Sequence, residues 1–207
     1  MRIDQVDALV LAGGRGARMG GVDKGLQSLA GRPLVAHALD RLRRQAGSRL
    51  GRILVNANRH FDDYRAFGVP VWPDALPDFP GPLAGFLAGL EHGQSPWLLT
   101  LPCDSPRFPL DLLERLAQAA EREAVDLALA VGPDADGRLR RQPVFCLLRR
   151  ELRGRLRAYL DQGGRKIDDW IAQQSHVAVV FDAPGDDPHA FYNANTLAEL
   201  RSLEIGL

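Results

Sequence analysis

The amino-acid sequence predicts an α/β protein in three layers, with a predominantly parallel, mixed central sheet covered by helices on both faces. Apolar segments of strand length alternate with helical segments along the 207 residues. The first apolar segment leads directly into a glycine-rich turn, an arrangement typical of ligand-binding sheets of this kind. Strands follow one another more closely around residues 125–148, which predicts an antiparallel strand within the sheet. No repeat or linker interrupts the pattern, so we expect one domain.

In the first half of the chain, apolar runs predict the strands and helical spacing predicts the helices between them. Val6–Ala12 is a mostly apolar run of strand length. Leu34, Ala38 and Leu42 recur on one face of a helix. These patterns predict strands over residues 6–12, 52–57, 69–72 and 97–101, and helices over 34–45, 61–67 and 83–91. A proline-rich loop separates the third strand from the third helix.

The second half of the chain continues the alternation. An amphipathic pattern predicts a helix over residues 110–122. Further strands are expected over 127–131, 144–148 and 177–181, and helices over 149–160 and 167–173. Thr196 would cap a closing helix over 196–203.

Composition and charge narrow the function classes. Basic and acidic residues are equal in number, 26 of each, whereas a nucleic-acid-binding protein usually has a basic excess. Cys103 and Cys146 form neither a disulfide framework nor a metal-ligand spacing, and the five histidines are scattered. No signal peptide and no membrane-spanning run is present. We therefore expect a cytoplasmic protein that binds neither nucleic acid nor membrane.

The glycine-rich turn over residues 13–25 is the strongest local signal. It holds five glycines between residues 13 and 21 and three cations, Arg15, Arg18 and Lys24. Glycines let backbone N–H groups approach a phosphate, and the cations balance its charge. A P-loop is excluded because Gly25 follows the lysine, and a dinucleotide fingerprint is disfavoured because Met19 stands where glycine is needed. A plain strand-to-helix turn is the structural alternative.

The same turn resembles the signature of a known enzyme family. Leu11-Ala-Gly-Gly14 followed by Arg18-Met-Gly and Lys24 resembles nucleotidyltransferases with a Rossmann-like fold, and the extended stretch 18–25 resembles the molybdenum cofactor guanylyltransferase (MobA) family. Four further stretches match in order: 55–60 (Val-Asn-Ala-Asn-Arg-His), 80–85 (Pro-Gly-Pro-Leu-Ala-Gly), 102–104 (Pro-Cys-Asp) and 193–196 (Asn-Ala-Asn-Thr). Together they cover nearly the whole chain.

This resemblance implies a reaction and its partners. The family transfers GMP from GTP to molybdopterin, with Mg²⁺ as cofactor and pyrophosphate as the second product. It implies a nucleotide-binding half over about residues 1–105 and an acceptor-binding half over about 106–207. It also implies transient contacts with other proteins of molybdenum cofactor synthesis and with the enzymes that accept the product.

The resemblance also assigns roles to individual residues. Catalysis falls to Arg18, Lys24 and Asp104, with Asp104 as the Mg²⁺ ligand. The nucleotide would be bound by Leu11, Ala12, Gly13, Gly14, Lys24, Asn56, Asp74 and Asp104. The acceptor would be bound by Gly81, Gly85, Asn193 and Asn195.

Each assignment has an ordinary structural alternative. Asp104 could cap the helix predicted near residue 110, although Ser105 or Asp111 suits that role better. Asn56 and Asp74 could be turn residues. Gly81 could simply precede a helix that starts with proline, and Asn195 could cap the last helix. Cys103 is expected to be a small buried residue.

Arg140 or Arg141 could reach the anionic pterin. The arginine-rich stretches 138–141 and 149–157 are otherwise expected to be solvated surface.

Alternative functions remain within and outside the enzyme class. A cytidylyltransferase acting on the same pterin shares the glycine-rich signature, and a sugar-phosphate nucleotidyltransferase is a third enzyme reading. A non-catalytic nucleotide- or cofactor-binding protein belongs to a different class. A dinucleotide-dependent oxidoreductase is disfavoured by Met19.

Overall fold

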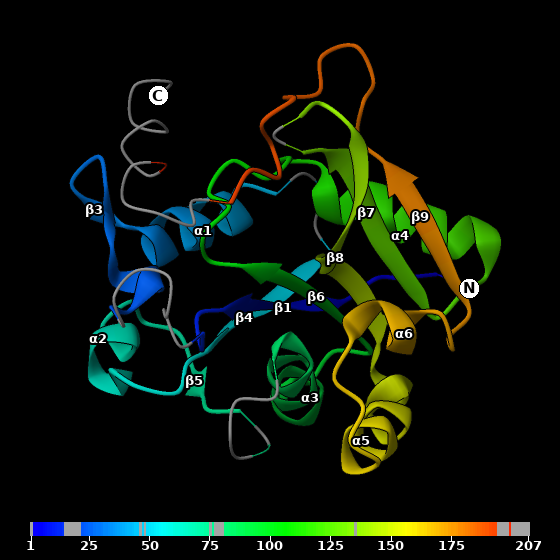
Figure 1. Cartoon of the computed structure of the whole chain (residues 1–207), viewed down its shortest axis with the longest axis horizontal. Coiled ribbons are helices and arrows are strands. Elements are labelled where there is room, and N and C mark those ends of the chain that lie inside the picture. Colours follow the sequence, from blue (N-terminus) through cyan, green and yellow to red (C-terminus); the bar gives the residue numbers. More distant parts are fainter. Residues whose placement is uncertain are drawn as a thin grey trace.

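The computed structural model describes residues 2–14, 22–45, 47, 49–74, 76, 81–134, 136–193 and 199. Its framework is a seven-stranded sheet in the order β5-β4-β1-β6-β8-β7-β9 (Figure 1). The strands are β1 (Val6–Leu11), β4 (Leu50–Asn56), β5 (Val71–Trp72), β6 (Trp97–Pro102), β7 (Leu127–Pro133), β8 (Leu139–Arg149) and β9 (His176–Val180). All neighbours pair in parallel except that β8 is antiparallel to both β6 and β7. The predicted mixed α/β sheet is thus confirmed, including its antiparallel strand.

Helices cover both faces of the sheet because strand side chains alternate between two apolar clusters. Val10 of β1 belongs to the cluster under α1 (Leu34–Arg43) and α4 (Leu112–Glu123). Leu9 belongs to the cluster under α3 (Pro82–His92), α5 (Arg153–Asp161) and α6 (Ile167–Ile171). A short helix, α2 (Phe61–Arg65), lies between β4 and β5. The core is therefore two apolar layers, one on each side of the sheet.

Helix α3 is buried almost all round and lies very close to the sheet. Residues 83–90 are all buried. A Cβ on Gly89 would lie 2.8 Å from Leu9 Cδ2, and a Cβ on Gly85 would lie 2.4 Å from Leu11 Cδ2. Small residues at these positions let the helix backbone reach the strands that lead to the glycine-rich turn.

Several predicted boundaries differ from the structure. β8 begins at Leu139, five residues before the predicted start at 144. The earlier start was missed because residues 139–141 are exposed and residues 140–143 show no apolar pattern. The helix expected from residue 149 begins at Arg153, after a 3₁₀ turn, η3 (Arg150–Leu152). The small hairpin of β2 (Ser28–Leu29) and β3 (Arg32–Pro33) was not predicted. The closing helix expected over 196–203 lies outside the described residues.

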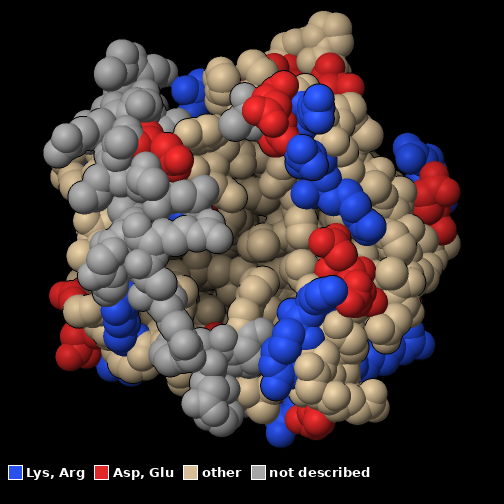
Figure 2. Space-filling view, in the orientation of Figure 1, with Lys and Arg blue, Asp and Glu red and all other residues tan. Residues whose placement is uncertain are grey.

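The surface carries charges of both signs. Acidic and basic side chains are interspersed on the face seen in Figure 2, which is hollowed near its middle. This mixture agrees with the formal net charge of zero. In the described part of the chain, every helix is too short or too polar to span a bilayer.

Candidate active site

A pocket of about 280 Å³ lies where β1, β4 and β6 end. The parallel register sets Leu11 beside Asn56 on one side and Pro102 on the other, so the three strands end together. The pocket is lined by Leu11, Gly13, Gly14, Asn56, Asp74, Gly81, Pro82, Pro102 and Val144. Six residues predicted to bind ligand therefore meet in one pocket, although they come from distant parts of the sequence.

A closed hydrogen-bond network surrounds Asp74 on one wall of this pocket. Asn56 Nδ2 donates to Asp74 Oδ1 at 3.0 Å, and Asn58 Nδ2 donates to Oδ2 at 2.8 Å. In return, the Asp74 N–H donates to Asn58 Oδ1 at 2.8 Å. Burial raises the pKa of Asp74, while the two amide donors act against that shift. Each carboxylate oxygen keeps a further lone pair with which to accept from a ligand.

Asn58 completes this network and was not singled out from the sequence. Its amide also donates to the Gly13 carbonyl at 3.0 Å, which ties the glycine-rich turn to the end of β4. A Cβ on Gly13 would lie 2.7 Å from Asn58 Nδ2, so the contact requires glycine. The sequence feature that could have indicated this role is a second asparagine, two residues after Asn56 and just beyond the strand.

Some backbone N–H and carbonyl groups near Ala12 are already hydrogen-bonded within the fold. Ala12 N–H donates to the Asn56 carbonyl at 2.8 Å, so this N–H is not available to a ligand. The Leu11 carbonyl accepts from Cys103 N–H at 3.1 Å. These bonds hold the end of β1 between β4 and β6, and leave Gly13 and Gly14 at the pocket wall.

Lys24 and Asp104 form an ion pair just beyond the end of β6, and neither residue lines the pocket described above. Both side chains are largely buried, with exposed fractions of 19% and 15%. Lys24 Nζ contacts Asp104 Oδ2, whereas Asp104 Oδ1 is buried and has no hydrogen-bond partner among the residues that the structure describes. An unpaired buried carboxylate oxygen is costly unless a ligand or cation satisfies it.

A divalent cation fits this carboxylate. Mg²⁺ is commonly held by one or two protein carboxylates together with phosphate oxygens and water. Among the described residues, no group of three or more His, Cys, Asp or Glu side chains forms a cage that could hold a metal without substrate. Asp104 is therefore suited to a metal that arrives with a phosphate ligand.

The alternative role of Asp104 as a helix cap is wrong. Helix α4 begins at Leu112, well after Asp104, and Asp111 occupies its N-cap position. Asp111 makes no side-chain cap bond, so the capping role expected for it is also absent. Ser105 does not cap the helix either, because its hydroxyl donates to Asn193 Oδ1.

Lys24 is presented by a short turn that is anchored in the core. The 3₁₀ turn η2 (Lys24–Leu26) starts after Asp23, whose Oδ1 accepts from Gly25 N–H at 3.2 Å. The buried Tyr64 hydroxyl donates to the same oxygen at 2.5 Å. A Cβ on Gly25 would lie 2.4 Å from that hydroxyl. Burial raises the pKa of Tyr64, so it remains a donor, and sequence reasoning missed this role.

The residues expected to bind the acceptor are less closely gathered. Gly81 lines the pocket and precedes α3 with a φ of 89°, which favours glycine. Gly85 lies inside α3, where a Cβ would meet Asn56 Oδ1 at 2.6 Å, so it makes room for Asn56. Asn193 reaches Ser105, the neighbour of Asp104.

Other expectations have mixed outcomes. Arg18 and Asn195 lie outside the described residues. Arg140 pairs with Asp134, and neither it nor Arg141 lines the pocket. Cys103 is buried as expected, and burial raises the pKa of its thiol, which disfavours a nucleophilic thiolate.

Comparison with known proteins agrees with this geometry. The family model of the MobA-like NTP transferase domain matches residues 8–179. The chain belongs to this family, and it is a nucleotidyltransferase. The family match runs from within β1 to within β9 and so includes part or all of every strand of the central sheet.

Relatives of high similarity carry one name. The molybdenum cofactor guanylyltransferase of Acidovorax ebreus is 59% identical and covers 96% of this chain and 95% of its own length. The protein of the same name from Cupriavidus necator is 53% identical, with 97% of each covered.

Solved structures support the fold. The molybdopterin-guanine dinucleotide biosynthesis protein A of Archaeoglobus fulgidus superposes with a TM-score of 0.73 at 20% identity, covering 96% of this chain and 97% of that one. The 4-diphosphocytidyl-2C-methyl-D-erythritolsynthase of Anaerococcus prevotii gives 0.72 at 12% identity, with coverages of 98% and 96%.

Proposed function

We propose that this chain is a molybdenum cofactor guanylyltransferase that transfers GMP from GTP to molybdopterin. The observation that carries the proposal is the meeting of two different polar groups at one set of strand ends. The Asn56–Asn58–Asp74 network follows the ends of β4 and β5, and Asp104, which pairs with Lys24, follows the end of β6. Relatives of that name, 53–59% identical over nearly full length, support the same activity.

The Asp74 network would select guanine. Guanine presents an N1–H and an N2 amino group side by side, and the remaining lone pairs of one carboxylate can accept both. Cytosine and adenine lack this pair of donors. A mismatched base would leave a buried polar group unpaired, at about 1–3 kcal/mol. Asn56 and Asn58 hold the carboxylate in place for this contact.

The glycine-rich turn and the Lys24–Asp104 pair would hold the triphosphate. The backbone of Gly13 and Gly14, the ammonium of Lys24 and the guanidinium of Arg18 supply positive groups for the phosphate oxygens. Asp104 would hold Mg²⁺ through its unpaired oxygen. When bound, the metal adds positive charge beside the phosphates.

The reaction would be a direct displacement. A terminal phosphate oxygen of molybdopterin attacks the α-phosphorus of GTP, a new P–O bond forms, and the bond to pyrophosphate breaks. Gly81, at the start of α3, and Asn193, beside Ser105, would orient the acceptor. No covalent enzyme intermediate is required, so the rate depends on the positioning of the substrates and on compensation of the phosphate charges.

The test is a reaction of purified protein with molybdate-loaded molybdopterin and GTP, CTP or ATP in separate samples, with the product read by mass. We expect a guanine dinucleotide from GTP alone, and expect chelation of divalent metal to abolish it. A cytosine product would contradict the role of the Asp74 network in base selection. Absence of product with every nucleotide, from folded protein that GTP still stabilises, would indicate a binding protein instead.

A further inference from the structure

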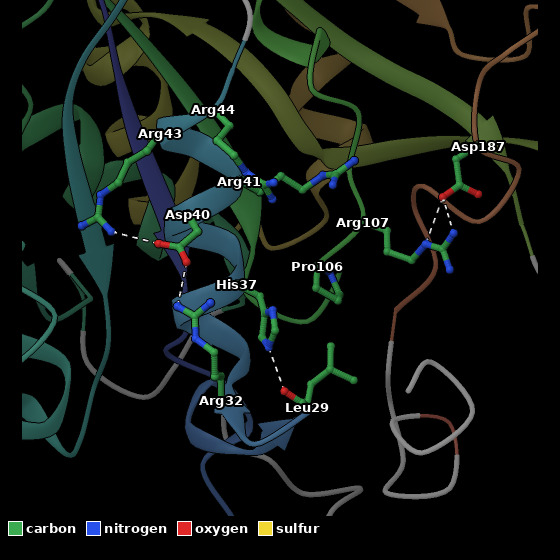
Figure 3. Close-up of a pocket in the computed structure, with 10 residues that line it drawn as sticks. All are labelled: Leu29, Arg32, His37, Asp40, Arg41, Arg43, Arg44, Pro106, Arg107 and Asp187. Carbon is green, nitrogen blue, oxygen red and sulfur yellow. Dashed lines mark hydrogen bonds and ion pairs between the residues drawn. The ribbon is translucent and has the colours of Figure 1, made fainter. Parts of the chain in front are cut away.

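A second pocket, of about 720 Å³, lies against the outer face of α1. It shares no lining residue with the active-site pocket. Five arginines line it: Arg32, Arg41, Arg43, Arg44 and Arg107. Figure 3 shows the α1 side chains on one side and Arg107 with Asp187 on the other, so the pocket is formed by segments distant in sequence.

The carboxylates in this pocket are too few to balance its arginines. Asp40 is shared between Arg32 at 2.6 Å and Arg43 at 3.2 Å. Asp187 pairs with Arg107 at 2.9 Å. These are the only acidic residues among the described lining residues, so positive charge is in excess within the hollow.

Arg41 and Arg44 carry the uncompensated charge. Neither forms an ion pair with a carboxylate within 4.0 Å among the described residues, and Figure 3 draws no dashed line from either to Asp40 or Asp187. Arg41 is half-buried, and its Nε donates to the Phe108 carbonyl, which fixes the side chain. Burial lowers the pKa of Arg41 and the positive charges of Arg44 and Arg107 add to this shift, whereas the negative charge of Asp187 acts against it.

Favourable interaction with the α1 dipole explains only part of this arrangement. Cations near the C-terminal end of a helix are stabilised by its carbonyls, which applies to Arg41 and Arg43 in the last turn of α1 and to Arg44 at its C-cap. Local contacts also hold two of these side chains, since Arg41 lies over the Phe108 ring and donates to the Phe108 carbonyl, and Arg107 pairs with Asp187. These contacts fix the side chains but supply only one carboxylate, so arginines still outnumber carboxylates in the lining of the pocket.

We propose that this pocket binds the diphosphate or triphosphate group of a small molecule, with Arg41 and Arg44 as the main donors. Guanidinium groups match phosphate oxygens in pairs, and a polyphosphate supplies the several negative charges that the pocket lacks. The volume is that of a small-molecule site. The ligand is free pyrophosphate or a nucleoside polyphosphate, which share this chemistry. The proposal does not depend on the reaction proposed above.

The test is calorimetric titration of pyrophosphate and of guanosine diphosphate, at low salt and with metal chelated. The Lys24→Ala variant serves as the background, because it removes the cation that would hold phosphate in the active site. We expect one equivalent of pyrophosphate to bind. Adding Arg41→Gln and Arg44→Gln is expected to weaken binding at least about tenfold. Adding Arg122→Gln and Arg157→Gln, which remove two exposed arginines elsewhere, should leave binding unchanged.

Two further comparisons identify the class of ligand and exclude unfolding of the variant as the cause of weaker binding. Equal binding of both compounds would assign the pocket to phosphate groups alone. Tighter binding of guanosine diphosphate would assign the pocket to a nucleotide only where Arg41→Gln and Arg44→Gln weaken it, because the Asp74 network remains intact in the Lys24→Ala background. Arg44→Gln alone, at an exposed position, should also weaken binding, and it guards against unfolding caused by loss of the Arg41 contact. Each of three outcomes would overturn the proposal. The first is an unchanged affinity for pyrophosphate in folded Arg41 and Arg44 variants, and the second is no binding of pyrophosphate in the Lys24→Ala background. The third is binding of a polyglutamate peptide but not of pyrophosphate.

Discussion

The candidate active site has two polar parts, the Asp74 network that we propose binds the base (the base side) and the Lys24–Asp104 pair that we propose binds the phosphates (the phosphate side). On the base side, Asp74 accepts from two amides and its own N–H is satisfied, so the group is fixed before any ligand arrives. On the phosphate side, Lys24 and Asp104 pair their charges, yet Asp104 retains a buried oxygen that no group in the described part of the chain satisfies. The difference suggests that one side is organised for selectivity by shape and hydrogen bonding. The other holds charge in readiness for a highly charged ligand.

Removing the phosphate-side cation should have the largest effect. We expect Lys24→Ala to lower kcat/KM by about 10²–10³ because one positive group facing the reacting phosphates is lost. Thermal unfolding should show that the variant still folds. The matched control is Lys166→Ala, which removes the only other lysine at an exposed position. Near-normal turnover by folded Lys24→Ala would remove Lys24 from the catalytic assignment.

Changing the base-side carboxylate should affect selection more than turnover. Asp74→Asn replaces one acceptor oxygen with a donor, so we expect the KM for GTP to rise about tenfold to a hundredfold. The preference for GTP over CTP should fall in parallel. Steady-state kinetics with both nucleotides measures this. If the preference for GTP over CTP is retained, another group recognises guanine, and the Asp74 network does not have the selective role that distinguishes it from the Lys24–Asp104 pair.

The raised pKa of Asp74 predicts two opposite pH effects. As pH falls toward this pKa, which is above the ordinary 3.8, the carboxyl gains a proton and loses acceptor capacity, so the KM for GTP should rise. The folded protein binds that proton more tightly than the unfolded chain does. The contribution of Asp74 to the free energy of unfolding should therefore increase as pH falls and be lost as pH rises through the folded-state pKa. Chemical denaturation and GTP kinetics across the same pH series would measure both; Asp74→Asn should flatten each profile.

Loosening the support of Lys24 should have the smallest effect. Tyr64→Phe keeps the ring in the core but removes the hydroxyl bond to Asp23, worth about 1 kcal/mol. We expect kcat to fall by up to about tenfold with the KM for GTP little changed, because the ammonium of Lys24 is still present but is held less precisely in position. Tyr159→Phe, which loses a bond to the Lys166 carbonyl at an exposed site, is the control. A loss of stability without any change in kcat would make Tyr64 purely structural.

The parts of the site that follow strands were predictable from the sequence. Asn56, Asp74 and Asp104 each come at or just after a predicted strand, and parallel strand ends meet at one edge of a sheet. Asn58 and Tyr64 were not predictable in the same way, because their roles depend on which distant group each side chain meets. Tyr64 is separated by 41 residues from the aspartate that it contacts.

The same limit applies to the fold and to the second pocket. The start of β8 was missed because residues 139–143 are mostly polar and exposed, and pairing with β7 determines their conformation. The arginine pocket joins α1 to residues 107 and 187, so no local pattern marks it. Arginine spacing on one helix indicates only a solvated face until the opposing segment is known.

The antiparallel insertion of β8 has a consequence for synthesis of the protein. β6 pairs with β1 on one edge, but its other edge is covered only by β8, which leaves the ribosome after α4 and β7. Until then, a nascent chain that has already formed β5-β4-β1-β6 presents the apolar strand Trp97–Pro102 as an open edge. Open apolar edges pair readily with other chains. Premature termination before residue 139 should therefore yield aggregates, and chaperone engagement should be greatest in that interval of translation.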